Sequence, residues 1–211
     1  GKIYEAYYNL NMHKQDVEIY DYGSGQGQAT ILLLDNFYTS QDKSLIKSIN
    51  FIELSELALK ISKNILRYWS PDILQEKINL IKKDINKLDI NDLKKNENTY
   101  KIHLFSYILD MGVVDAKKII EKIFNIKGKH FIWAVSQNSN DDRMNKANIN
   151  PKTNKLFFEE FYDELDLQIS NSPNIEKKSQ NYQIDLLNTK IINSSFQEKP
   201  ILIFGRYIEV K

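Results

Sequence analysis

The sequence predicts an α/β protein, a three-layer α/β/α sandwich around a mostly parallel seven-stranded sheet with an antiparallel C-terminal hairpin strand. Two observations predict this class. Strand-type and helix-type segments alternate along most of the chain, which is typical of parallel strands joined by right-handed crossovers. Two further strand-type segments near the C-terminus have too little chain between them for a helix, so we expect them to pair as antiparallel neighbours.

The strand-type segments are short apolar or alternating runs bounded by polar residues or turn formers. In chain order they cover 17–22, 48–54, 77–85, 100–109, 129–136, 182–192 and 201–210. The helix-type segments repeat apolar residues at three- and four-residue steps. They cover 2–14, 28–37, 55–69, 115–124 and 156–167. A polar stretch at 138–155 is the expected long loop.

Two of these segments carry more specific expectations. The helix over 55–69 begins at Ser55 and is stopped by Pro71. We expect Trp69 to be a core residue at its end and His103 to be a hydrogen-bonded structural residue in a buried strand. One face of that helix carries the apolar residues Leu57, Ile61, Ile65 and Leu66.

Bulk composition excludes several classes of protein. The chain has 211 residues, 42% hydrophobic and 27% charged, with a formal net charge of +1, which is ordinary for a soluble domain and carries no strong nucleic-acid signature. No apolar run is long enough to span a membrane, and the start does not resemble a signal peptide, so we expect a cytoplasmic protein. The start at Gly1, without Met, indicates either a cloning residue or a domain taken from a longer, multidomain chain.

Residue types that hold metals in proteins are scarce in this chain. There is no Cys, which excludes disulfides, thiolate metal sites and Cys nucleophiles. The three histidines, His13, His103 and His130, are far apart and have no metal-ligand spacing. The sequence therefore predicts no metal site.

A glycine-rich turn joins the strand at 17–22 to the helix at 28–37. It reads Asp21-x-Gly23-x-Gly25-x-Gly27. Glycines in such a turn permit positive φ angles and a close approach of the backbone to a ligand, and the following helix offers free N–H groups to a carboxylate or phosphate. The acid before the first glycine favours a ligand with a cationic group. The turn therefore predicts a binding site for a small ligand.

The spacing of the glycines separates two kinds of nucleotide-binding turn. The dinucleotide fingerprint GxGxxG has its third glycine or alanine three residues after the second, where this chain has Gln28 or Thr30, depending on the pair counted. The phosphate-loop pattern GxxxxGK[ST] is absent. The GxGxG spacing with a preceding acid resembles motif I of class I S-adenosylmethionine-dependent methyltransferases.

Later residues continue the resemblance in the family's order. Glu53 closes the second strand, where a carboxylate can accept hydrogen bonds from both hydroxyls of a ribose, as it also does in NAD enzymes. Asp84 follows the third strand, where the family often has an acid beside the adenine amino group. The end of the fourth strand, Phe105 to Asp110, corresponds to the motif IV region. Taken singly, Glu53 also fits a charge at a helix N-terminus, and Asp84 a turn residue.

The resemblance implies S-adenosylmethionine as the cofactor and gives residues their roles. Gly23, Gly25 and Gly27 would line the methionine part, with Asp21 supporting its ammonium group directly or through water. Glu53 would hold the ribose. The further implied contacts are Leu54 and Ile85 on the faces of the adenine, Asp84 at its amino edge, and Ser106 and Tyr107 beneath the sulfonium, facing the acceptor.

The resemblance also implies a division of the chain. Residues 1–14 would form an N-terminal helix that covers the cofactor site, with Tyr4, Tyr7 and Tyr8 among its aromatic residues. Residues 15–211 would form the methyltransferase-like domain.

The activity implied is methyl transfer to an acceptor that no residue pattern identifies. Ser106-Tyr107-Ile108-Leu109 departs from the (D/N)PP(Y/F) pattern of enzymes that methylate exocyclic amino groups of bases, and the lack of Cys excludes the cysteine-adduct route to pyrimidine carbon-5. Small molecules, proteins and RNA remain as acceptors, and Ser106 and Tyr107 are weak candidates for a catalytic role. Two alternatives stay open: a non-catalytic methyltransferase-like binding module of a larger multidomain protein, and an NAD-linked oxidoreductase.

Overall fold

The computed structural model describes residues 14–38, 42–89, 91–93, 98–137, 149–173, 175–176, 181–183 and 201–210. The expected N-terminal helix over 1–14 lies outside these residues except for Lys14. Most of the expected loop at 138–155 and of the strand expected at 182–192 lies outside them as well.

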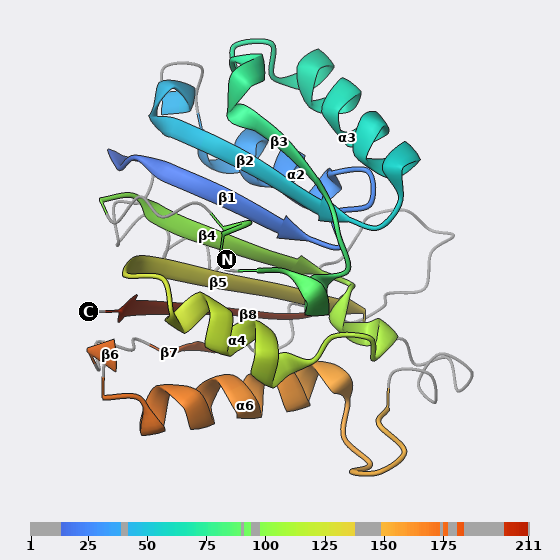
Figure 1. Ribbon diagram of the computed structural model, residues 1–211, viewed down its shortest axis with the longest axis vertical. Coiled ribbons are helices and arrows are strands. Elements are labelled where there is room, and N and C mark those ends of the chain that lie inside the picture. The colour runs from blue at the N-terminus through green and yellow to red at the C-terminus, as the bar shows by residue number, and fades with distance from the viewer. Residues whose placement is uncertain are drawn as a thin grey trace, which may run out of the picture.

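One mixed sheet forms the centre of the fold (Figure 1). Its strands are β1 (Val17–Tyr22), β2 (Ile46–Glu53), β3 (Ile78–Lys82), β4 (Tyr100–Ser106), β5 (Gly128–Gln137), β6 (Ile175–Glu176), β7 (Asn181–Gln183) and β8 (Ile201–Val210). The order is β3-β2-β1-β4-β5-β8-β6, and β7 also pairs with β8. Strands β1 to β5 are parallel, whereas β8 is antiparallel to β5, β6 and β7.

This topology confirms the mostly parallel sheet and its antiparallel C-terminal hairpin. The expected number of strands was wrong, because the described residues form eight strands instead of seven. The additional strand is β6, which has two residues. A strand so short leaves no alternating pattern for sequence analysis to detect.

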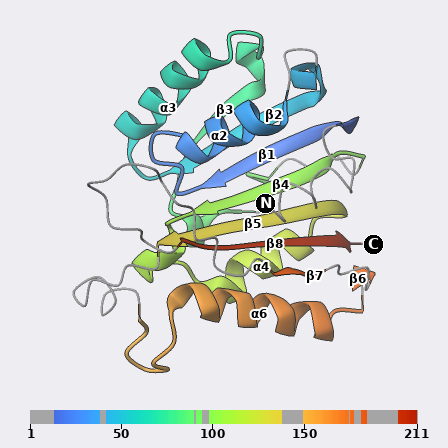
Figure 2. The ribbon, with the colours of Figure 1, turned by 180° about the vertical axis from the view of Figure 1, so that it is seen from behind.

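Helices cover both faces of the sheet. They are α2 (Gln28–Phe37), α3 (Glu56–Trp69), α4 (Ala116–Phe124) and α6 (Phe157–Asn171). One apolar cluster joins α2 and α3 to the sheet, and a second joins α4 and α6 to the opposite face. The α4 layer faces the viewer in Figure 1 and the α2 layer does so in Figure 2. The three-layer α/β/α arrangement is therefore present.

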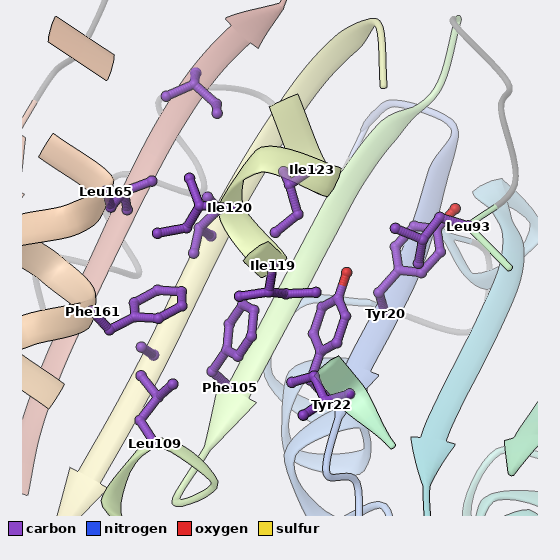
Figure 3. Packing of buried hydrophobic residues seen from close by; sticks show 14 of the residues in the cluster. Tyr20, Tyr22, Leu93, Phe105, Leu109, Ile119, Ile120, Ile123, Phe161 and Leu165 are labelled. Carbon is purple, nitrogen blue, oxygen red and sulfur yellow. The ribbon is translucent and has the colours of Figure 1, made fainter. Parts of the chain in front are cut away.

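The face under α4 and α6 is packed with aromatic and branched side chains (Figure 3). Tyr22 and Phe105, from neighbouring strands, stack with ring centroids 4.5 Å apart. The ring centroid of Phe161 from α6 lies 4.9 Å from that of Phe105. Ile119 and Ile120 from α4 are fully buried in the same cluster. All six residues of β1 are buried, as expected for a central parallel strand.

Helix α3 begins where the sequence predicts but faces the sheet differently. The hydroxyl of Ser55 accepts a hydrogen bond from the Ala58 N–H at 3.2 Å and so caps the helix. Trp69, which was expected in the core, is 56% exposed, and Leu57, on the apolar face of the helix, is 68% exposed. The buried positions are Leu59, Ser62 and Leu66.

The parallel strands bring their C-terminal ends to one edge of the sheet. Tyr22 at the end of β1 is in register with Ile52 of β2 and Phe105 of β4. The arrowheads of β1, β2 and β4 in Figure 1 mark this edge. Open α/β sheets bind ligands there, and the segments that follow these strands carry the candidate site.

Candidate functional site

The glycine loop leaves β1 and is held against the end of β2. The N–H groups of Gly23 and Ser24 both donate to the Ile52 carbonyl, at 2.8 and 3.1 Å, and the Gly27 N–H donates to the Ser24 carbonyl at 2.7 Å. The three glycines have φ angles of 62°, 51° and 78°, a region that favours glycine. The predicted turn between strand and helix is thus present, with its backbone folded back on itself.

The three glycines differ in what a side chain would meet. A Cβ on Gly23 would lie 2.7 Å from the Ile108 side chain, and one on Gly27 would lie 2.9 Å from Phe51. Packing within the protein therefore requires glycine at these two positions. A Cβ on Gly25 would meet no atom within 4 Å among the described residues, so the open side of the loop is at Gly25.

Asp21, near the end of β1, ties the strand to the helix that follows the loop. Its side chain is 1% exposed, and its Oδ2 accepts a hydrogen bond from Thr30 Oγ1 at 2.8 Å. Burial raises the pKa of Asp21 to about 7, against the lowering effect of the hydrogen bonds from Thr30, and the charge of Glu53 adds to the rise. Asp21 is thus a buried acid whose charge a nearby cation would favour.

Glu53 lies directly beside the open part of the loop. Its Oε2 accepts the Gly25 N–H at 3.2 Å, and its Oε1 accepts the Ser55 N–H at 2.9 Å. A carboxylate has about four lone-pair directions, so these two bonds leave each oxygen able to accept one more. The half-buried carboxylate is therefore oriented by the backbone and still able to bind hydroxyl groups.

The residues predicted to contact an adenine differ in how exposed they are. Leu54, directly after β2, is 64% exposed, whereas Ile85 is buried in the cluster under α4. Asp84 is half-buried, and its carboxylate accepts the Asn86 N–H at 2.9 Å, which caps a short 3-10 turn. Strand β3 ends at Lys82, so both Asp84 and Ile85 lie in the turn that follows.

The end of β4 presents the residues predicted to face an acceptor. Ser106 is half-buried in the last position of the strand. Tyr107 has a φ angle of 60°, unusual for a residue other than glycine, and the residue is 41% exposed. Its N–H donates to the Val135 carbonyl at 2.8 Å, which holds this strained residue at the strand end.

Contacts between the loops bring the predicted residues together. Ile108 packs against Gly23, so the segment after β4 touches the glycine loop. The side chain of Asn86 donates to the Val113 carbonyl at 2.7 Å and accepts the Asp115 N–H at 2.8 Å, which ties the turn after β3 to the start of α4. Sequence analysis did not identify Asn86, because its partners are 27 and 29 residues away.

The histidines of the described chain lie in the core and not at this edge. Tyr22 Oη lies 2.9 Å from His103 Nδ1, His103 Nε2 lies 3.0 Å from His130 Nδ1, and His130 Nε2 lies 2.8 Å from the Ile126 carbonyl oxygen. Since a carbonyl only accepts, His130 donates from Nε2, His103 then donates to His130, and Tyr22 donates to His103. The expectation that His103 is a structural residue is confirmed.

Two features are absent from the described residues. Their helices include none with the length and apolar character needed to cross a membrane. They also contain no group of three His, Asp or Glu side chains placed to hold a metal ion.

Comparisons with known proteins match the fold but not the sequence. No protein-family model matches the chain, and no curated protein sequence matches it. The structure is similar to the plantazolicin methyltransferase BpumL, crystallised with a triazolic desmethylPZN analogue and S-adenosylhomocysteine. The TM-score is 0.60, with 15% identity over 100% of this chain and 83% of the other.

Two other solved structures are similar over nearly the whole chain. Geranyl diphosphate C-methyltransferase from Streptomyces coelicolor matches with a TM-score of 0.51 and 9% identity, over 98% of this chain and 77% of that one. A Listeria monocytogenes protein assigned as an S-adenosylmethionine-dependent methyltransferase matches with a TM-score of 0.53 and 10% identity, over 100% of both chains. The chain has the class I methyltransferase fold, as its motifs predict.

Proposed function

We propose that the protein is an S-adenosylmethionine-dependent methyltransferase whose acceptor is a small molecule, a protein or an RNA. One observation supports this most. Gly25, the open position of the glycine loop, lies hydrogen-bonded to Glu53 at the sheet edge where ligands bind. The two residues whose predicted roles are close backbone approach and ribose binding are therefore neighbours.

The topology of the sheet favours this function over NAD-linked oxidation. The dinucleotide-binding fold continues the strand order 3-2-1-4-5 with a parallel sixth strand. Here the strand beside β5 is β8, which is antiparallel. The missing third glycine of the dinucleotide fingerprint agrees with this difference.

In the proposed complex the described residues bind the donor along the edge of the sheet. The backbone at Gly25 approaches the donor, and the remaining lone pairs of Glu53 accept the ribose hydroxyls. Leu54 supplies most of the apolar contact with the adenine because Ile85 is already buried, and Asp84 lies at the amino edge. The charge of Asp21 favours the ammonium group of the donor from beneath the loop.

The proposed chemistry needs positioning more than activation by the protein. The donor, when bound, supplies a methyl group on a sulfonium, which is already a good leaving group. The main task of the protein is then to hold the acceptor in line, and a general base is required only for an acceptor that loses a proton. Ser106 and Tyr107, at the end of β4, are the residues proposed to face the acceptor.

Calorimetric titration tests the proposal directly. S-adenosylmethionine, S-adenosylhomocysteine and NAD are each titrated into the protein. We expect both sulfur nucleosides to bind and NAD to give no signal. Binding of NAD alone, or of none of the three, would overturn the proposed function.

A second experiment separates turnover from binding. The protein is incubated with methyl-labelled donor and a panel of small molecules, proteins and RNA, and transfer of label is measured. We expect label in one acceptor class. Tight binding of the donor with no transfer to any acceptor would favour the binding module over the enzyme.

A further inference from the structure

Three large apolar side chains are exposed on the short segment that follows β4. In the segment from Tyr107 to Val113, Tyr107 is 41% exposed, Met111 66% and Val113 49%. One exposed apolar side chain is ordinary on a protein surface, whereas several together mark a binding surface. Ile108, in the same segment, packs against Gly23. The segment with the exposed side chains therefore lies next to the glycine loop.

Hydrogen bonds and packing fix the backbone of this segment from three sides. The Tyr107 N–H is bonded to β5, and the Asn86 side chain, from the turn after β3, donates to the Val113 carbonyl at 2.7 Å. Gly112, at a φ of 63°, packs against the Phe157 ring at the start of α6, where a Cβ would have no room. The exposed side chains are thus presented on an ordered backbone, which lowers the entropic cost of binding a ligand.

The charged side chains in the two segments that touch the glycine loop are all acids. These segments cover 53–57 and 106–113, and their charged residues are Glu53, Glu56 and Asp110. Lys82, at the end of β3, is paired with Glu56 at 3.0 Å. Binding of RNA depends on Lys and Arg side chains that neutralise its phosphates. The surface therefore disfavours RNA and other anionic acceptors.

The size of the apolar surface favours a small molecule over a protein. At this edge of the sheet the described residues expose five large hydrophobic side chains, the three of the segment after β4 together with Leu54 and Leu57. A stable protein interface uses about 20–30 residues a side. A small-molecule site, in contrast, consists of several apolar side chains and a few polar groups, which matches the scale of this surface.

We propose that Tyr107, Met111 and Val113 bind the acceptor, and that the acceptor is an apolar small molecule without negative charge. The inference rests on the proposed function and narrows its three acceptor classes to one. Met111 is the most exposed of the three residues, and its unbranched side chain can adapt to the shape of a ligand. It is therefore the residue whose substitution tests the inference best.

NMR of the methionine methyl groups tests the inference with a matched set of probes. With the donor site filled by S-adenosylhomocysteine, hexylamine, hexanol and hexanoate are added in turn; they share one apolar chain and differ in charge. The protein has three methionines, and a Met111→Leu variant identifies the Met111 signal. We expect hexylamine and hexanol to shift this signal, and hexanoate to bind roughly fivefold more weakly because the nearby acids repel it. A uridine decanucleotide should leave the signal unchanged.

Met111→Lys should change which charge the surface prefers. We expect this variant to bind hexanoate more tightly than hexylamine, as measured from the NMR signals of the ligands. Leu167→Lys is the matched control, because Leu167 is also exposed, at 52%, but lies in the second half of α6. It should keep the order of the wild type. If Met111→Lys does not fold, Val113→Lys changes the same surface and should show the same reversal.

Each outcome decides between the inferences. Failure of the wild type to bind S-adenosylhomocysteine would overturn the proposed function and this inference with it. If S-adenosylhomocysteine binds, three results would overturn the acceptor class alone: no shift of the Met111 signal by hexylamine or hexanol, tighter binding of hexanoate or the oligonucleotide, or an unchanged order in the Lys variant. Transfer of labelled methyl groups only to proteins or RNA would do the same. A shift by hexylamine and hexanol, with the order reversed in the Lys variant, would support the inference.

Discussion

Replacing Asp21 with Asn should change how the stability of the protein depends on pH. Asp21 is 1% exposed, and its burial raises its pKa from 3.8 to about 7. The pKa of Asp21 in the folded protein is thus roughly three units above its ordinary value. At about 1.36 kcal/mol per unit, ionising this carboxyl lowers the free energy of unfolding by about 4 kcal/mol. The loss is large beside the typical stability of a domain, about 5–15 kcal/mol.

The direction follows from the protons bound in each state. Between about pH 4 and pH 7 the unfolded chain has released the Asp21 proton and the folded protein has kept it, so the free energy of unfolding falls as the pH rises. Below pH 4 both states are protonated, and above pH 7 the loss is complete. Asn cannot ionise, yet it can accept the hydrogen bond from Thr30. The variant should therefore lack the loss of stability that the wild type shows as the pH rises.

Urea unfolding at several pH values, followed by circular dichroism, measures the effect. The stability of Asp21→Asn relative to the wild type should rise by about 4 kcal/mol from pH 4 to pH 8. Asp115→Asn is the control: the hydrogen bond from Lys118 lowers the pKa of Asp115, and Asn also caps helices, so its difference should be flat above pH 5. A flat difference for Asp21→Asn as well would refute the burial described for its carboxyl.

Three further outcomes are expected. Gly27→Ala should lower the free energy of unfolding by about 1–3 kcal/mol, because its φ is 78° and its Cβ would lie 2.9 Å from Phe51; an unchanged urea midpoint would contradict this packing. Glu53→Ala should weaken calorimetric binding of S-adenosylhomocysteine by about 1–3 kcal/mol, and equal affinity would count against its ribose role. Burial lowers the pKa of His130 to about 3, so stability that is present above pH 6.5 should be lost as the pH falls towards 3. His130→Gln should lose less stability over that range, and a parallel acid decline in variant and wild type would speak against this assignment.

Local signals were enough to place several elements of the fold. The predicted bounds of β1 and α2 agree with the structure, and Ser55 and Asp115 cap α3 and α4. These features depend on residues within a few positions of each other, such as a hydroxyl or carboxylate that accepts an N–H three residues later. A single sequence contains that information completely.

The face that a helix turns to the sheet depends on distant residues, and here the prediction was wrong. Apolar character alone placed Trp69 in the core and Leu57 on the same face of α3 as Leu66. In the structure Ser62 is buried and lies against the glycine loop, since a Cβ built on Gly27 would be 3.0 Å from the Ser62 Cβ. A small residue at this point of α3 leaves room for the glycine loop, while Leu57 and Trp69 are exposed.

In the candidate site, too, the sequence predicts the local motif but not the contacts between distant segments. The residue types of the glycine loop and Glu53 were visible as a spaced motif. The contacts that shape the site were not, because the partners of Asp21, Asn86 and Gly23 are set by the packing of separate loops. Tyr107 shows the limit most clearly: a hydrogen bond to β5 holds it at a φ of 60°, where sequence analysis expected the strand to continue.

Binding of S-adenosylhomocysteine to a Gly25→Val variant measures most directly whether the open side of the glycine loop holds the donor. The side chain would enter space that no described residue fills, at a backbone strain of about 1–2 kcal/mol, so the variant should remain folded by circular dichroism. We expect the calorimetric signal seen for the wild type to disappear. A folded variant with the affinity of the wild type would show that the donor does not bind at this loop.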